Sequence, residues 1–421
     1  MQPKRYLLCG TGGRGLGMFG QPLLEDFPET ARLVGLFDHS PVRLRGCAEL
    51  LDRPDLPQFT EFDRALADLD PDAVIVSTRD CTHAEFICGA LAAGKRAISE
   101  KPVCTTVEQC RQILSAQRAS TALGLVTHNV RYDPAYSLIK RIVSDGEIGQ
   151  VRSIDFRETL DRRHGADYFR RWHRVKANSG GLLIHKASHH FDILNWLAGS
   201  RPAWLSAQGS TVFYGKNGPF RAARCRECPH AERCEFYVDL FADERNVRLY
   251  RDAEIDDGYV RDGCVFDENI DAEDQASVIY RYENGVQVTF SLTAFAAIES
   301  HHLRIQGTRG ELDYFVSYDT AWADGNITVP GLESFTGERL MLFVPNDGIR
   351  QVEIPTVAGG HGGADPQLRQ EFFGRDWDKP PSDQMASLEQ AIQAVLVGAA
   401  ANRSIASGQP VADVQSLLGE A

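Results

Sequence analysis

Short apolar runs alternate with helix-length polar segments over the first 127 residues. The runs occupy residues 6–9, 33–37, 73–76, 96–98 and 123–126. Nearly continuous apolar strands with helical crossovers are typical of a parallel sheet that is buried on both faces. The pattern predicts an α/β class protein in which residues 1–127 form a doubly wound parallel sheet of the Rossmann type.

Beyond Asp133-Pro134, apolar and polar residues alternate with the period of two that half-buried strands show. The clearest strand is 276–282, and Asn284-Gly285 predicts that it turns back through a type I′ hairpin onto residues 286–290. Residues 128–421 are therefore predicted to form a second, α+β domain with a large, open, mostly antiparallel sheet and helices on one face. Further strands are expected at 151–156, 302–307, 311–316 and 340–354, and helices at 134–146, after Gly180-Gly181 and from 387 to 408.

A glycine-rich turn, Gly10-Thr11-Gly12-Gly13-Arg14-Gly15, directly follows the first predicted strand. In the spacing G-x-G-x-x-G, the glycines permit a tight turn, a close approach of a pyrophosphate and close packing of helix on strand. Asp38 ends the second strand, where a carboxylate accepts hydrogen bonds from an adenosine ribose and repels a 2′-phosphate. These features predict a dinucleotide site that favours NAD over NADP. Arg14 and Arg43 argue against this preference, because their positive charges would favour a 2′-phosphate.

Further motifs follow in a characteristic order: Ser77-Thr78-x-x-x-x-His83, Glu100-Lys101-Pro102, and Gly180-Gly181 followed by His189 and Asp192. With the glycine turn and Asp38, they resemble the Gfo/Idh/MocA oxidoreductases, which include inositol 2-dehydrogenase and glucose–fructose oxidoreductase. The resemblance covers nearly the whole chain and implies homodimers or homotetramers that pack through the C-terminal sheet. The residues expected at the cofactor are Gly10, Thr11, Gly12, Gly13, Arg14, Gly15, Asp38, Ser77, Thr78, His83, Glu100 and Lys101.

By position, Lys101 corresponds to the family's lysine that touches the substrate hydroxyl and the nicotinamide ribose, and His189 to its proton-transferring histidine. The chemistry also favours these residue types, because an imidazole titrates near neutrality and an ammonium group stabilises a developing alkoxide. His185 departs from the family, in which many members have aspartate. Helical spacing places His185, His189 and Asp192 on one face, so His185 is a third catalytic candidate. Asp192 either orients His189 or pairs with a neighbouring cation.

The remaining site candidates are polar and aromatic residues in two segments, around 127–132 and 164–171. The first segment is equally consistent with an interdomain hinge, and the second with a surface loop. The histidine pair could also bind a metal, although the neighbouring motifs favour catalysis. The predicted substrate contacts are Asn129, Arg131, Tyr132, His164, Tyr168, Arg171, His185 and His189.

Four of the ten cysteines lie in a charged insert at about 216–270. Cys225-x-x-Cys228, Cys234 and Cys264 offer four thiolates, the ligand set that structural zinc prefers. An iron–sulfur cluster and unmetallated thiols are the alternatives, and disulfides are disfavoured in a reducing compartment.

Composition limits the partners of the chain. With a net charge of −13 there is no basic surplus for nucleic acid or anionic membranes, and no apolar run is long enough to cross a bilayer. The N-terminal residues lack the pattern of a signal peptide, so a cytoplasmic protein is expected.

Together these features predict an NAD-dependent dehydrogenase acting on CH–OH groups. The expected substrate is a small carbohydrate-type molecule, oxidised at a secondary hydroxyl of a sugar, cyclitol or polyol. A lyase or glycosidase that uses tightly bound NAD transiently is the alternative enzyme class. A non-catalytic NAD sensor is the third hypothesis. The presence of both Lys101 and His189 argues against it.

Overall fold

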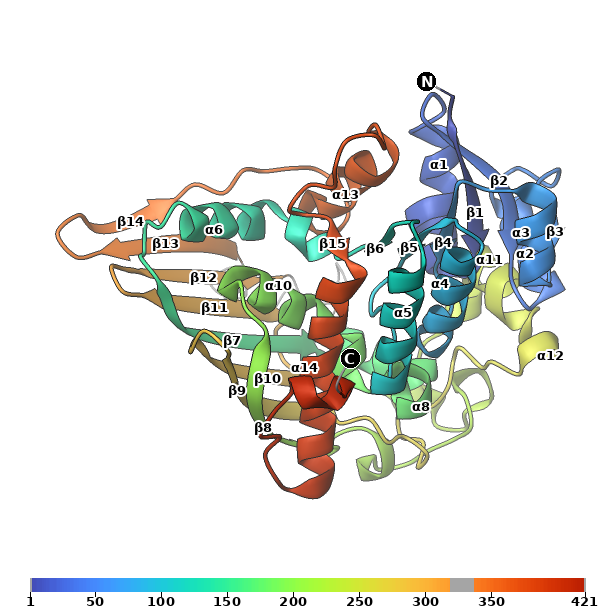
Figure 1. The fold of residues 1–421 in the computed structure, drawn as a ribbon. Helices are drawn as coiled ribbons and strands as arrows, with labels where there is room; N and C mark the ends of the chain where they lie inside the picture. Colours follow the sequence, from blue (N-terminus) through green and yellow to red (C-terminus); the bar gives the residue numbers. More distant parts are fainter. Residues whose placement is uncertain (1, 319–336, 420–421) are drawn as a thin grey trace.

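The computed structural model describes residues 2–318 and 337–419, which form two β-sheets flanked by helices (Figure 1). The first sheet has the order β15-β6-β5-β4-β1-β2-β3, and its strands are parallel except for β15. Buried strands and helical crossovers make it the predicted Rossmann-like sheet. Its strands are β1 (Lys4–Cys9), β2 (Ala31–Phe37), β3 (Gln58–Phe59), β4 (Ala73–Val76), β5 (Arg96–Ser99), β6 (Gly124–Val126) and β15 (Ala386–Ser387), and its helices are α1 (Gln21–Glu25), α2 (Pro41–Leu50), α3 (Phe62–Leu69), α4 (His83–Ala92) and α5 (Val107–Ala119).

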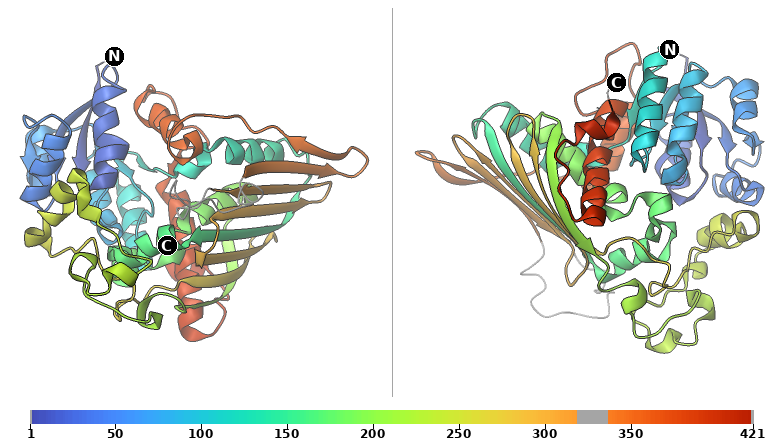
Figure 2. Two further views of the ribbon diagram at one scale, coloured as in Figure 1. Left: turned by 180° about the vertical axis from the view of Figure 1, so that it is seen from behind. Right: turned by 60° about the horizontal axis from the view of Figure 1, so that its bottom comes forward.

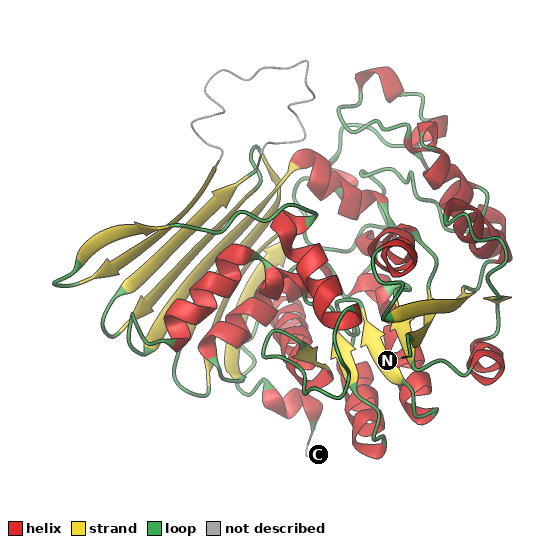
Figure 3. Ribbon diagram, turned by 90° about the horizontal axis from the view of Figure 1, so that it is seen from above, coloured by secondary structure: helices red, strands yellow, loops and turns green. Residues whose placement is uncertain are grey.

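The second sheet has the order β14-β13-β12-β11-β7-β10-β9-β8 and is antiparallel except between β7 and β10. Helices α6 (Pro134–Ser144), α10 (Ser188–Ala198) and α14 (Leu388–Ser407) lie on one side of it (Figures 2 and 3). Along β9, buried and exposed residues alternate, as expected for a sheet with one covered face. The strands are β7 (Val151–Asp161), β8 (Pro202–Ser210), β9 (Gln275–Tyr282), β10 (Gln287–Ala296), β11 (Ser300–Gly307), β12 (Glu311–Ser317), β13 (Gly337–Val344) and β14 (Gly348–Val352).

Two local predictions were wrong. The hairpin between β9 and β10 has a three-residue loop, Glu283–Gly285, in which Gly285 has a φ of +88° while Asn284 is not in the left-handed region. A type I′ turn needs a positive φ at both central residues, so the loop belongs to the class with one left-handed glycine. The single strand expected at 340–354 is a hairpin, because Asn346 adopts a φ of +80° between β13 and β14.

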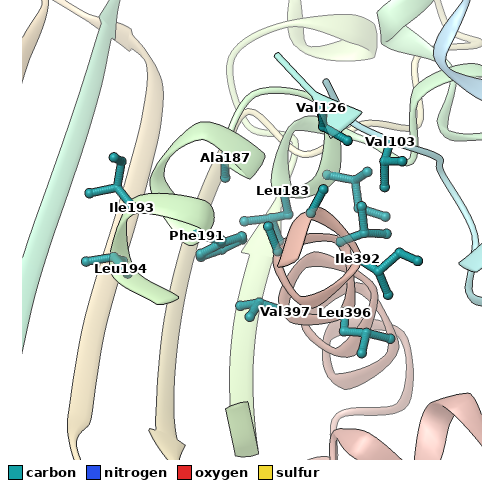
Figure 4. Close-up of a cluster of buried hydrophobic side chains, with 14 of the residues drawn as sticks. Val103, Val126, Leu183, Ala187, Phe191, Ile193, Leu194, Ile392, Leu396 and Val397 are labelled. Carbon is teal, nitrogen blue, oxygen red and sulfur yellow. The ribbon is translucent and has the colours of Figure 1, made fainter. Parts of the chain in front are cut away.

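The two sheets share a hydrophobic core around α14. Ile392 and Leu396 lie on one side of this helix, with Val103 above Ile392, and Val397 lies on the other side, near Phe191 of α10 (Figure 4). Immediately before α14, β15 pairs with β6 through Ala386 and Val126. The C-terminal segment therefore completes the first sheet and joins it to the second.

The cysteine-containing insert extends away from the second sheet and packs against the first. Its helices α11 (Glu244–Asn246) and α12 (Glu254–Asp257), yellow in Figure 1, lie beside α2. Ser40 and Arg43 at the start of α2 hydrogen-bond to Asp256 and Asp257 of the insert. None of the helices in the described residues is long and apolar enough to cross a membrane.

Candidate active site

A cavity of about 790 Å³ lies at the carboxyl ends of the strands of the first sheet. Open α/β sheets bind ligands at this edge, where the strand order reverses. The opposite wall is formed by α7 (Arg162–Arg170), α9 (Leu182–His185), α10 and parts of the insert. The cavity therefore faces both halves of the molecule.

The glycine turn is built for a close approach of backbone to ligand. Gly10 has a φ of +95°, and a Cβ there would lie 2.5 Å from the carbonyl carbon of Ser77. A Cβ on Gly15 would lie 2.1 Å from the Gly10 oxygen. Gly10, Gly12, Gly13 and Arg14 line the cavity, whereas Thr11 and Gly15 support the turn from behind. A side chain at Gly10 or Gly15 would therefore disrupt the turn. The exposed backbone of the turn fits a pyrophosphate.

Asp38 lies at the end of β2 and faces the cavity beside this turn. Its Oδ2 accepts hydrogen bonds from the backbone N and the hydroxyl of Thr11, at 2.9 and 3.1 Å. Its Oδ1 accepts from the Ser40 N at 3.0 Å and from Arg43 Nη1 at 2.9 Å. Asp38 therefore fixes the glycine turn and also presents a carboxylate at the expected ribose position.

Lys101 follows β5 and is brought to the same edge. Its Nζ donates to the His185 carbonyl oxygen at 3.0 Å, and burial lowers its pKa to about 8. At neutral pH the group is still mainly a cation.

Glu100 and His83 flank Lys101 at the cavity. Glu100 accepts a hydrogen bond from Arg14 Nε at 2.8 Å. The two ring nitrogens of His83 lie 2.8 Å from the Pro102 carbonyl oxygen and 3.2 Å from that of Thr78. His83 thus joins two strand ends as well as lining the cavity.

His185 and His189 both line the cavity but do not belong to one continuous helix. Helix α9 ends at His185, and α10 begins at Ser188. The expectation of a shared face on a single helix was therefore wrong. His185 Nδ1 is 2.5 Å from Asp80 Oδ2, a contact that brings an acidic residue from the loop after β4 into the site. Burial raises the pKa of Asp80 to about 7.

His189 is a buried imidazole that lines the cavity. Its Nδ1 makes no hydrogen bond within residues 2–318 and 337–419. Burial, together with the positive charges of Lys101 and Lys186, places its pKa well below the usual value. His189 is consequently neutral at physiological pH and able to accept a proton.

Within the described ranges, Asp192 has no hydrogen bond or ion pair with His189. Its carboxylate forms a buried two-point ion pair with Arg131, at 2.7 Å for each oxygen. Asn129 donates to Asp365 at 2.8 Å, and Tyr132 packs in the hydrophobic core. Asn129, Arg131 and Tyr132, predicted as substrate contacts, are thus absent from the cavity wall and hold the junction between the two halves.

The other predicted substrate contacts do line the cavity. His164, Tyr168 and Arg171 come from α7 and the residue that follows it. His164 Nδ1 lies 2.8 Å from Glu299 Oε2, and the Tyr168 hydroxyl lies 3.3 Å from His164 Nε2. Sequence reasoning did not identify several further lining residues, although Lys186 adjoins a predicted one and Asp80 lies in a strand-end loop. They include Asp80, Trp172, His173, Lys186, Tyr250, Glu299 and His301.

Among the described residues, one group of three or more potential metal ligands has its atoms within 4.8 Å of one another: Glu158, His190 and His301. Lys186 Nζ is 3.1 Å from the same Glu158 carboxylate. This ammonium group already balances the carboxylate charge, so the cluster is better described as a charge network beneath the cavity. The four insert cysteines are free thiols in the structure and do not form such a group.

The fold and the site define a dinucleotide-dependent oxidoreductase. Residues 4–128 match the model of an oxidoreductase family with an NAD-binding Rossmann fold, and residues 140–412 match the C-terminal α/β domain of the same family. The chain belongs to the Gfo/Idh/MocA oxidoreductase family, as its motifs indicated. It is an enzyme of the NAD-dependent dehydrogenase class.

Individual relatives support this assignment. YteT of Bacillus subtilis (strain 168) is 32% identical over 97% of both chains. Inositol 2-dehydrogenase of Rhizobium meliloti (strain 1021) is 29% identical over 43% of this chain and 52% of its own length. The fold is similar to that of levoglucosan dehydrogenase in complex with NADH and levoglucosan. The TM-score is 0.68 and the identity is 20%, over 98% of this chain and 100% of that one.

Proposed function

We propose that this dehydrogenase oxidises a secondary hydroxyl of a sugar, cyclitol or polyol, with NAD as the coenzyme. One observation carries the proposal: the Lys101 ammonium group and the neutral His189 imidazole line the same cavity as the glycine turn and Asp38. A hydride acceptor, a cation and a base are the three components that alcohol oxidation needs.

Bound NAD would supply hydride acceptance at its nicotinamide ring. The backbone of residues 10–15 would hold its pyrophosphate, and Asp38 its adenosine ribose. Lys101 would stabilise the negative charge that develops on the substrate oxygen. His189 would accept the hydroxyl proton during oxidation and return it in the reverse reaction.

The substrate class follows from the wall opposite the coenzyme. His164, Tyr168, Trp172 and Glu299 combine hydrogen-bonding groups with aromatic faces, a surface suited to a ring that carries several hydroxyls. The names of the relatives inositol 2-dehydrogenase and levoglucosan dehydrogenase are consistent with such substrates. Neither the cavity nor the relatives support the lyase or glycosidase alternative.

A screen of sugars, cyclitols and polyols tests the proposal. Purified protein and NAD are expected to give a steady rise in NADH absorbance with at least one such compound. Consumption of a compound without NADH appearance would instead indicate transient oxidation. Absence of both signals across the panel would contradict the proposed substrate class.

We also propose that the protein forms a homodimer or homotetramer through the second sheet. The face of this sheet opposite α6, α10 and α14 has no described helix against it and exposes apolar residues such as Ile279 and Ile349, which are 50% and 66% exposed (Figure 3). Light scattering is expected to give two or four times the mass of one chain. Ile279→Lys should shift this mass toward that of the monomer, and a monomeric wild-type protein would contradict the proposal.

The insert cysteines are proposed to bind one structural zinc ion. Arg224 and Gly263 form an antiparallel bridge that brings the Cys225 and Cys264 segments side by side, and the Phe266 N–H donates to Cys264 Sγ at 3.4 Å. Burial raises the pKa of Cys225 and of Cys234, so a metal would have to displace protons from these thiols. Metal analysis should find about one zinc per chain and less in Cys228→Ser. If protein purified from zinc-replete medium contained no zinc, the proposed zinc site would be excluded.

A further inference from the structure

The insert contacts the dinucleotide site directly. The Tyr250 hydroxyl accepts a hydrogen bond from the Gly13 N–H at 2.7 Å, and the Arg245 guanidinium donates to the Gly13 carbonyl. Arg43 Nε donates to the Leu249 carbonyl at 2.9 Å. These contacts come from a part of the chain more than 200 residues away from the glycine turn in sequence. The insert therefore forms a second wall of the site.

Asp257 is a residue of this wall that lines the cavity beside the expected ribose position. Its Oδ2 lies 2.6 Å from Arg43 Nη2 and 3.2 Å from Arg79 Nη2. The other terminal nitrogen of Arg43 is 2.9 Å from Asp38 Oδ1, the carboxylate expected at the ribose. Asp38, Arg43, Arg79 and Asp257 all line the cavity. Two guanidinium groups thus converge on one carboxylate oxygen beside the expected position of the 2′-hydroxyl.

Two converging guanidinium groups are the arrangement that proteins use to bind a phosphate. Here the Asp257 carboxylate occupies both arginines, so neither guanidinium is free for an incoming phosphate. With Asp257 present, the two arginines and the two aspartates sum to zero charge. A phosphate with about two negative charges would then meet two carboxylates and no unpaired cation.

We propose that Asp257 of the insert closes a two-arginine anion site at the adenosine ribose and thereby makes the enzyme selective for NAD over NADP. The inference rests on the proposed use of NAD. It assigns coenzyme selectivity to a residue outside the Rossmann-like sheet, in addition to Asp38. Removal of the Asp257 charge would leave Arg43 Nη2 and Arg79 Nη2 available to a 2′-phosphate.

Coenzyme binding to the full-length free enzyme tests this proposal without any substrate. Fluorescence titration with NADH and NADPH gives two dissociation constants for each variant. Asp257→Asn is expected to tighten NADPH binding about tenfold or more, which is the effect of one charge-assisted hydrogen bond, while NADH binding changes much less. Adding Arg43→Ala to Asp257→Asn should abolish most of the gain in NADPH affinity.

Asp256→Asn is the matched control. Asp256 accepts a hydrogen bond from the Ser40 hydroxyl at 2.5 Å, so it also docks the insert, but among the residues that the structure describes it forms no ion pair with Arg43 or Arg79. It should therefore keep the wild-type ratio of NADPH to NADH affinity. A similar gain in this control would overturn the proposal, because it would assign the effect to loosening of the insert.

An unchanged affinity ratio in Asp257→Asn, with NADH binding retained, would overturn the inference and leave the proposed function intact. If Asp257→Asn does not fold, Asp257→Ser removes the same charge with a smaller side chain, and the same criterion applies. A wild-type protein that binds neither coenzyme would overturn the proposed function itself, and the inference with it.

Discussion

Replacing Lys101 with methionine is expected to lower kcat by about 10²–10³-fold while changing NAD affinity far less. Removal of one group that stabilises a developing oxyanion has an effect of this size. Lys101 is partly buried at the cavity, and its Nζ donates to the His185 carbonyl rather than to a carboxylate at ion-pair distance in the described part of the chain. Its charge is therefore available to a substrate oxygen. Methionine keeps an unbranched apolar side chain that is one atom shorter than lysine and removes the charge.

Lys95→Met is the control for this experiment. Lys95 and Lys101 flank opposite ends of β5, and Lys95 pairs with the exposed Asp70 on the far side of the sheet. The control should retain wild-type kcat. Steady-state kinetics and NADH titration provide the two readouts. Full activity of Lys101→Met would remove this residue from the reaction.

The second large effect is expected for His189→Asn, which should lower kcat by about 10²–10⁴-fold, the usual contribution of a general base. His185→Asn should have a smaller effect, because His185 Nδ1 is already engaged with Asp80. If His185→Asn lowered kcat more than His189→Asn did, the role of general base would pass to His185.

The pH profile provides an independent readout of the base. A base must be neutral to accept a proton, so activity is lost as pH falls through its pKa. Burial and the neighbouring lysines lower the pKa of His189 below its usual 6.5, which places the acidic limb of the kcat profile below that pH. The limb should disappear in His189→Asn. An acidic limb that persists unchanged would indicate another base.

The Rossmann-like sheet and the alternating strands were predictable because their patterns are local. The helix expected from 387 to 408 is α14, and Ser387 and Gln390 form a capping box at its start. Strands β3 and β15 were missed, since two residues carry no periodicity. The break between α9 and α10 was missed because a helical spacing of polar residues continues across it.

Motifs identified Lys101 and His189, the proposed catalytic pair, and both line the cavity, whereas the residues around them were not predicted. Arg131 was predicted to bind substrate, but its partner Asp192 lies 61 residues away in sequence, and only folding brings the two together. The contact of Asp80 with His185 spans 105 residues, and that of Asp257 with Arg43 spans 214. Pairings at such separations are set by tertiary packing, which a single sequence does not display.

The pairing of β15 with β6 has a consequence for biosynthesis. The Rossmann-like sheet gains its last strand only after residue 387 has left the ribosome, and the apolar residues of α14 that cover its edge emerge later still. An N-terminal fragment ending near residue 128 would expose Val103 and Val126 to water. Cotranslational folding of this half therefore stays incomplete until synthesis is nearly finished, when both halves consolidate together.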